Sequence, residues 1–187
     1  KSLFGTNPIC FGAPTGKVPF ILDTSSSIIN RGKIRRAYKF GEKIPYGVAL
    51  DKNGLITTNA KKALEGSQLP IAGFKGSGLA WMIDILSGVL TGSSHGGKTK
   101  DPFDDFSGPQ NVGHLFITIN PKVFVGTGFL KEIKKNIKSV KKLPRAKGFK
   151  SILYPGERKN NLYKKNLNKD ISIPNKILKE MSELNAI

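Results

Sequence analysis

The residues with the clearest chemical potential form a glycine-rich stretch that contains one lysine and leads into an apolar segment. It reads GFKGSG, from Gly73 to Gly78. Its glycines permit close approach of the backbone to a ligand, the N–H groups at a helix start attract anions, and Lys75 adds a positive charge. The lysine position does not fit a Walker A loop, and no G-x-G-x-x-G fingerprint is present. Spacing alone leaves an anion-binding loop and a tightly packed helix start equally open.

A second candidate site follows an apolar, strand-like segment. PFILDTSSS, over residues 19–27, ends in an acid and a run of hydroxyls. Asp23 could accept hydrogen bonds from ribose hydroxyls, while Thr24 and Ser25 could donate to a ligand. The same residues could instead cap the next helix, and spacing alone favours that structural role.

Two further stretches place arginine beside glycine. INRGK puts Arg31 and Lys33 around a glycine, and arginine is well shaped to bind a carboxylate through two hydrogen bonds. YPGER places a Pro-Gly turn before Glu157 and Arg158, which could hold a ribose or a phosphate. For both stretches, the alternative without a binding role is a solvated, charged surface.

The histidines and the cysteine offer less. His95 lies in a polar loop, and His114 begins an expected strand, where a structural hydrogen bond is the commoner role. With two histidines and one cysteine, we expect no metal site. Cys10, being single, can form no internal disulfide, which favours a cytoplasmic setting, and we expect its side chain in the core.

The elements that must position these residues are of mixed type. Short strands and turns are expected up to about Gly66, with DKNG (Asp51 to Gly54) as a turn. Helices are expected within 25–41, capped by Ser27 or Asn30, then over 78–90 after a Ser77 cap, over 128–143, and from about Pro174. Further strands are expected over 114–121 and from 151, running into a turn. Residues 91–113 read as a long polar loop with solvated Asp104 and Asp105.

Charge is strongly unbalanced, with 31 basic and 13 acidic residues and a net charge of +18. Roughly half of the basic residues lie in 131–187, which could attract nucleic acid. That segment contains few aromatic residues for base stacking and no recognition-module signature, so a solvated lysine-rich surface is favoured. No apolar run reaches the length needed to span a membrane.

Taken together, the motifs resemble the malate/L-lactate dehydrogenase family. This is a family of non-Rossmann, NAD(P)H-dependent 2-oxoacid reductases that also includes ureidoglycolate, sulfolactate and diketogulonate dehydrogenases. The matching stretches recur in the family's order from Lys1 to about Arg158: GTNP with FGAPTG, ILDTSSS, RGKI, IPYGVALDKNGLITT, GFKGSGLAWMIDILSGVLTG, GHLFITINP and YPGER.

The resemblance implies a fold and a division of the chain. The fold would be mixed α/β, with a largely antiparallel sheet and flanking helices that bind NAD(P) without a Rossmann domain. Residues 1–127 would form the NAD(P)-binding and substrate-lining core. Residues 128–187 would supply a helix, a strand and a tail that pack back on an N-terminal part missing from this chain. A homodimer would be the usual assembly.

The resemblance also implies roles for individual residues. The enzyme would transfer a hydride between NAD or NADP and C2 of a small 2-hydroxy or 2-oxo acid. Residues matching the family's cofactor contacts are Asp23, Thr24, Ser25, Phe74, Lys75, Gly156, Glu157 and Arg158. Those matching its substrate contacts are Thr6, Arg31 and Gly32. Alternatives are a truncated cofactor-binding or assembly module without turnover, and a basic nucleic-acid-binding domain.

One departure from the family's pattern concerns catalysis. Members are about twice as long and carry an N-terminal S-H-G-x-x-R motif, whose histidine donates a proton and whose arginine helps hold the substrate carboxylate. SSHGGK, over residues 93–98, lies in the wrong place and lacks the arginine of the motif. We therefore assign no catalytic proton donor here, and expect a C-terminal fragment that is inactive alone.

Overall fold

The computed structural model describes residues 3–184 and has the mixed α/β character that the sequence predicts. The strands are β1 (Ile9–Ala13), β2 (Phe20–Thr24), β3 (Ala49–Leu50) and β4 (Ser67–Gln68). The helices are α1 (Arg31–Lys39), α2 (Ala60–Glu65), α3 (Phe74–Asp84), α4 (Lys122–Val125), α5 (Phe129–Lys141), α6 (Glu157–Asn166) and α7 (Asn175–Leu184). A π-helical turn, η1 (Ile85–Val89), and a 3-10 turn, η2 (Gly126–Gly128), complete the set.

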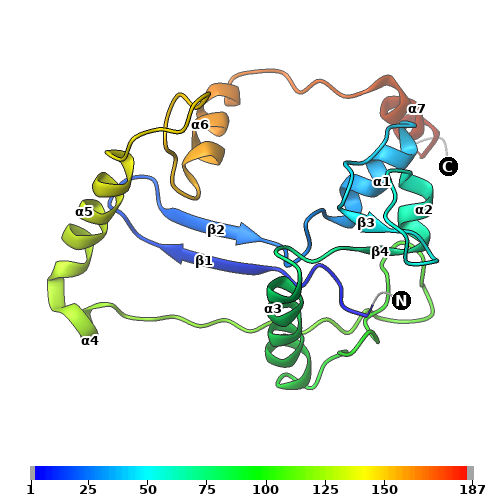
Figure 1. The fold of residues 1–187 in the computed structure, drawn as a ribbon, viewed down its shortest axis with the longest axis horizontal. Coiled ribbons are helices and arrows are strands. Elements are labelled where there is room, and N and C mark those ends of the chain that lie inside the picture. The colour runs from blue at the N-terminus through cyan, green and yellow to red at the C-terminus, as the bar shows by residue number, and fades with distance from the viewer. Residues whose placement is uncertain (1–2, 185–187) are drawn as a thin grey trace. The chain divides into compact units, whose positions relative to one another are not determined.

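The strands form two small sheets. β1 pairs with β2, and their arrows run in opposite directions in Figure 1. β3 pairs with β4 in antiparallel register, with Ala49 opposite Gln68. No helix within residues 3–184 has both the length and the apolar character needed to cross a membrane.

The chain divides into two compact units. The first comprises residues 1–11 and 22–126, and the second comprises residues 12–21 and 127–187. The β1–β2 hairpin contributes its open end to the first unit and its tip to the second. We describe each unit by itself.

The first unit is organised around the buried face of α1. Ile34 is only 1% exposed and packs with Ala37 against alanines of α2 and with Val48 beside β3. The helix begins where the sequence predicts, because the Asn30 side chain accepts a hydrogen bond from the Lys33 N–H at 2.8 Å. The short helix α2, which the sequence pattern does not reveal, begins in the same way after Asn59.

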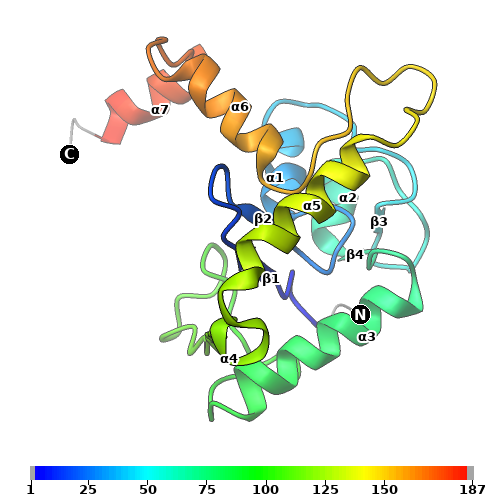
Figure 2. The ribbon, with the colours of Figure 1, turned by 90° about the vertical axis from the view of Figure 1, so that its left-hand side faces the viewer.

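The helix α3 begins four residues earlier than predicted. The expected Ser77 cap is wrong, since α3 starts at Phe74 after Gly73, whose φ is +60°. GFKGSG is therefore the first turn of a helix and not a loop before it. Figures 1 and 2 draw α3 and η1 as one continuous coil. Gly76 is buried here because the chain doubles back on the carbonyl and the N–H of Ile71.

Three other elements follow the prediction. The helix α5 lies inside the predicted 128–143 range, and α7 starts directly after Pro174. The DKNG turn is also confirmed, since the Gly54 N–H donates to the Asp51 carbonyl at 3.0 Å. Each of these elements is specified by local signals, namely apolar periodicity, a proline and an Asx turn.

Two predicted strands and one predicted core residue are wrong. Residues 114–120 form no strand within the described chain, and Phe116 is 89% exposed. Residues 151–154 likewise form no strand, and the turn after them leads into α6. Cys10 is exposed, like every residue of β1 except Ala13. An alternating pattern predicts a strand only if another backbone completes its hydrogen bonds.

The close contact at Gly76 generates a test of stability. Gly76→Ala should destabilise the chain by about 1–3 kcal/mol, because a Cβ there would overlap the Ile71 backbone, with its N atom at 2.8 Å. Gly78→Ala is the matched control in the same helix, where a Cβ meets nothing within 4 Å. It should stabilise by about 0.5–1 kcal/mol. Urea unfolding followed by circular dichroism measures both, and equal effects would contradict the packing argument.

Candidate functional site

The end of β2 is joined to the start of α3 by backbone pairing within the first unit. The Ile71 N–H donates to the Ser26 carbonyl at 2.9 Å, and the Ile28 N–H donates to the Leu69 carbonyl at 2.9 Å. Between these bonds, Ser27 forms an antiparallel β-bridge with Pro70. Ser25 therefore lies one residue before this pairing, and Phe74 lies three residues after it. The two stretches that sequence left as separate candidates therefore lie close together in the first unit.

The hydroxyls after β2 are engaged locally and do not cap α1. Ser26 is buried, and both its N–H (2.9 Å) and its hydroxyl (3.0 Å) donate to the carbonyl of Thr6. Ser25 donates to the Ser27 carbonyl at 2.9 Å, and Thr24 donates to the Ser25 carbonyl at 3.1 Å. The capping role that spacing favoured is wrong, because Asn30 is the cap.

Thr6 is brought to the end of β2 by its backbone. Besides accepting from Ser26, it precedes Asn7, whose side-chain amide donates to the Ala80 carbonyl of α3 at 2.8 Å. Asn7 adopts a positive φ of 35°, a conformation that asparagine tolerates better than most residues. The N-terminal segment therefore contacts both the end of β2 and α3.

The start of α3 has the features of an anion site. Phe74 is 83% exposed and Lys75 is also exposed. A Cβ built at Gly73 would meet nothing within 4 Å, so the backbone at the helix start is open to a ligand. A helix N-terminus bears partial positive charge, to which the lysine adds a full charge.

Arg31 and Gly32 form the first turn of α1. The Arg31 Nη2 donates to the Leu64 carbonyl at 3.1 Å, and its Nε lies 3.3 Å from the Asp101 carboxylate. The Nε–H is buried and makes an ion pair with Asp101 without hydrogen-bond geometry. Gly32 is exposed beside it.

Asp101 is a charged partner of α1 that the sequence did not reveal. Its two carboxylate oxygens accept from Arg35 Nη2 at 2.9 and 3.0 Å, and the same Nη2 donates to Asp104 at 2.8 Å. Phe103 lies under the Arg35 guanidinium at 4.3 Å. Asp104 is exposed, as predicted, with 65% of its side chain accessible, and it also pairs with Arg35. Only the spacing of two arginines by four residues on one helix face could have suggested an acidic partner.

Opposing influences act on the pKa of Asp101. Burial, the largest single influence, raises it, while the Phe103 N–H and then Arg35 and Arg31 lower it, so the pKa is lowered below its ordinary value of 3.8 overall. The pKa of exposed Asp105 is also lowered, mainly by the Ser107 hydroxyl and N–H. The carboxylate of Asp101 therefore stays ionised at neutral pH.

The turn at residues 154–158 belongs to the second unit. The Pro155 carbonyl accepts from the Ile21 N–H at 3.1 Å, and the Tyr154 hydroxyl donates to the Val18 carbonyl at 2.9 Å. Gly156 has a φ of +95°, and a Cβ there would lie 2.8 Å from the Pro19 carbonyl oxygen. Glu157 begins α6 and pairs with Lys141, while Arg158 is exposed.

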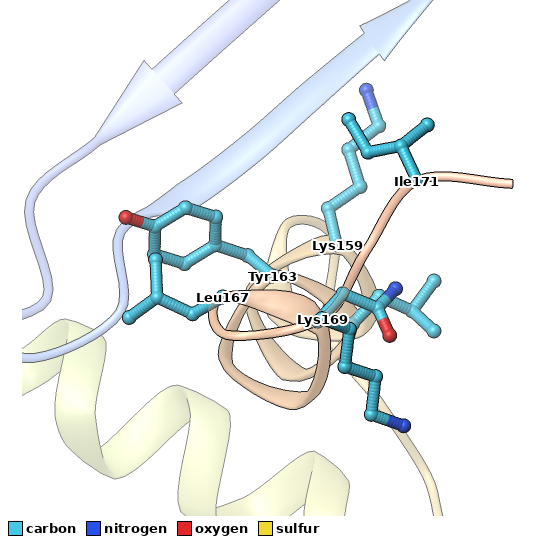
Figure 3. A pocket seen from close by; sticks show the side chains of 7 residues that line it. Lys159, Tyr163, Leu167, Lys169 and Ile171 are labelled. Atoms are coloured by element: carbon cyan, nitrogen blue, oxygen red, sulfur yellow. The ribbon is translucent and has the colours of Figure 1, made fainter.

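A hollow of about 480 Å³ also lies on the second unit, against α6. Figure 3 shows the ammonium groups of Lys159 and Lys169 pointing away from each other. Its lining residues are Lys159, Leu162, Tyr163, Asn166, Leu167, Lys169 and Ile171. None of the predicted site residues lines it, and every lining side chain is exposed.

Neither histidine lies in an acid–base arrangement that the described contacts support. His95 places its Nδ1 3.0 Å from the Ser93 carbonyl, and His114 packs at a tilt on Phe116. Within residues 3–184, no group of three or more His, Cys, Asp and Glu side chains could hold a metal ion.

Comparison with known proteins assigns the class. Solved dehydrogenases share the fold: sulfolactate dehydrogenase from Methanocaldococcus jannaschii superposes with a TM-score of 0.82 at 36% identity, over 98% of this chain and 52% of that one. The malate/L-lactate dehydrogenase family model matches residues 1–182. The chain therefore belongs to the malate/L-lactate dehydrogenase family.

Curated relatives support the same assignment. Malate/(S)-sulfolactate dehydrogenase of Methanothermus fervidus is 36% identical over 97% of this chain and 52% of its own length. Ureidoglycolate dehydrogenase (NAD(+)) of Escherichia coli K12 is 37% identical over 82% of this chain and 44% of its own. The chain thus spans about half the length of the relatives it matches.

The lowered pKa of Asp101 generates a prediction about pH. Because the folded pKa is depressed, the carboxylate's contribution to stability is present above pH 3.8 and is lost as pH falls through the folded pKa. Asp101→Asn should therefore lower Tm at pH 6, through a loss of roughly 1–2 kcal/mol, and this difference should shrink below pH 3.8. Asp170→Asn, at an exposed acid outside the loop, is the control. A difference that does not vary with pH would contradict the ion pairs.

The Gly156 turn generates a second prediction. Gly156→Ala and Gly148→Ala both place a side chain at positive φ, +95° and +89°, which costs about 1–2 kcal/mol each. Only Gly156 also approaches backbone, since a Cβ at Gly148 meets nothing within 4 Å. The Gly156 variant should therefore be less stable by a further 1–3 kcal/mol or so in urea unfolding. Equal losses of stability in the two variants would show that a Cβ at residue 156 does not clash with the backbone of residues 19–21.

Proposed function

We propose that this chain is the cofactor-binding and substrate-lining part of an NAD(P)H-dependent dehydrogenase that acts on a small 2-hydroxy or 2-oxo acid. The observation that carries the proposal is the backbone pairing of Ser26 with Ile71, which places the end of β2 beside the start of α3. Family membership supplies the reaction class. When bound, the nicotinamide exchanges a hydride with C2 of the acid.

The residues fit a dinucleotide at the start of α3. Lys75 and the N–H groups of the first helical turn would bind phosphate oxygens, since both favour negative charge. Phe74 would lie against the cofactor as an exposed aromatic ring. Asp23, Thr24 and Ser25 would meet it from the end of β2, with the exposed Asp23 carboxylate accepting from a ribose hydroxyl. The family resemblance also predicts a cofactor contact at Gly156, Glu157 and Arg158, which belong to the second unit.

The substrate would be bound by the first turn of α1. Arg31 provides a guanidinium for the substrate carboxylate, and Gly32 lets the acid approach the backbone. Thr6 would border the same region through its position beside Ser26. These residues bind and orient. A proton donor for the substrate oxygen would come from the S-H-G-x-x-R motif, which this sequence does not contain.

The assembly and its location form part of the proposal. A homodimer and a cytoplasmic location are what the family resemblance suggests. Exposed apolar side chains at Phe116, Ile117 and Ile119 support packing against a further part of the enzyme, because such a run is costly to leave in water. Residues 1–127 would be the cofactor and substrate core, and residues 128–187 would pack on that further part.

The cofactor site is tested by one lysine pair. Lys75→Ala should weaken NADH or NADPH binding about fivefold, or about 1 kcal/mol, because one phosphate-facing charge is lost. Lys61→Ala, at an exposed lysine of α2, removes the same charge and should leave binding unchanged. Titration of nucleotide fluorescence on the 187-residue chain measures both.

The outcomes separate a specific site from general attraction. Equal weakening by both lysine variants would show that the high positive charge attracts the nucleotide without a site at α3. Binding that Lys75→Ala does not weaken at all would contradict the assignment of the helix start.

A further inference from the structure

The polar loop after η1 is held against α1 by charge. Arg31 and Arg35 lie one helical turn apart on α1, and both face Asp101. Asp101 accepts from the Phe103 N–H at 2.9 Å, and its own carbonyl accepts from the Asp105 N–H at 3.0 Å, so residues 101–105 form a hydrogen-bonded turn. The turn therefore presents a fixed carboxylate, whose side chain is 28% exposed, to the first turn of α1.

Two of the three guanidinium nitrogens of Arg31 have a partner. Nη2 donates one proton to the Leu64 carbonyl, and Nε faces Asp101. A guanidinium has five N–H donors in a fixed plane, so these contacts set its orientation. Among contacts within residues 3–184, Nη1 and the second proton of Nη2 are left for a ligand. Guanidinium N–H groups bind a carboxylate through two parallel hydrogen bonds, and Nη1 and Nη2 are the atoms that can supply them here.

Arg35 determines how strongly Asp101 acts on Arg31. Both oxygens of Asp101 accept from Arg35 Nη2, at 2.9 and 3.0 Å, whereas the Arg31 Nε lies at 3.3 Å without hydrogen-bond geometry. Asp101 is thus bound mainly by Arg35 and orients Arg31 without occupying the edge that would face a ligand. A solvated loop acid would show neither the shared arginine nor the turn that fixes it.

We propose that Asp101 is a positioning residue for substrate binding: held by Arg35, it fixes Arg31 so that Nη1 and Nη2 face the carboxylate of the 2-oxo acid. The inference rests on the proposed function, in which Arg31 binds that carboxylate. It adds Asp101, and no other acid of the loop, to the substrate site. It also predicts that disturbing the loop acid changes affinity for substrate and not the chemical step.

The test uses steady-state kinetics of the complete dehydrogenase that contains this chain, with oxaloacetate and pyruvate as probes. Asp101→Asn keeps the size of the side chain and removes its charge, and should raise KM for the 2-oxo acid about five- to tenfold. The kcat should stay within about twofold, and the Kd for NADH should not change. Asp101→Glu should restore part of the lost affinity. Asp105→Asn, in the same loop but bonded to Ser107, is the matched control and should leave KM unchanged.

Arg31→Lys separates this inference from the proposed function. If Arg31→Lys leaves KM unchanged, the substrate role of Arg31 is wrong. If Arg31→Lys raises KM but Asp101→Asn does not, only the positioning role is overturned. A lower KM in Asp101→Asn would also overturn it, because Asp101 would then be competing with substrate. Should Asp101→Asn fail to fold, Arg35→Gln releases the acid without changing it, and KM should rise in the same way.

Discussion

Burial of one face of α1 is the interaction on which the site depends. Ile34 and Ala37 pack on the alanines of α2 and on Val48, and burying an isoleucine side chain contributes about 1.5–3 kcal/mol. That packing fixes the direction in which the adjacent face of α1 points. Arg31 and Arg35 lie there, and they hold the acidic turn of the loop against the helix. Hydrophobic burial therefore places the charges, and the charges place the loop.

A second constraint assembles the cofactor side. The pairing of residues 26–28 with 69–71 starts two residues after β2 and stops three residues before α3, so it brings the end of β2 close to the start of α3. Gly76 permits this geometry, because only a residue without a Cβ can lie on the Ile71 backbone.

Features specified by neighbouring residues could be predicted from the sequence, whereas features that depend on a distant segment could not. The helices α1, α5 and α7 and the DKNG turn were predicted from local capping and periodicity. The strand expected over 114–121 and the buried Cys10 were wrong, since both depended on what another segment would cover or pair with. The start of α3 was misplaced because glycine at 73 and 76 suggested a loop, whereas tertiary packing against Ile71 allowed a helix.

The sequence by itself determined the family, the mixed α/β class and most of the candidate residues, because motif order and side-chain chemistry are properties of the chain. It could not show that Asp101 belongs with Arg31, or that Ser26 pairs with Ile71. The first contact joins residues that are 70 positions apart, and the second joins residues that are 45 positions apart. The tertiary structure decided them, because an ion pair or a backbone hydrogen bond forms only when packing brings its partners within about 3 Å, and spacing in the sequence does not encode that distance.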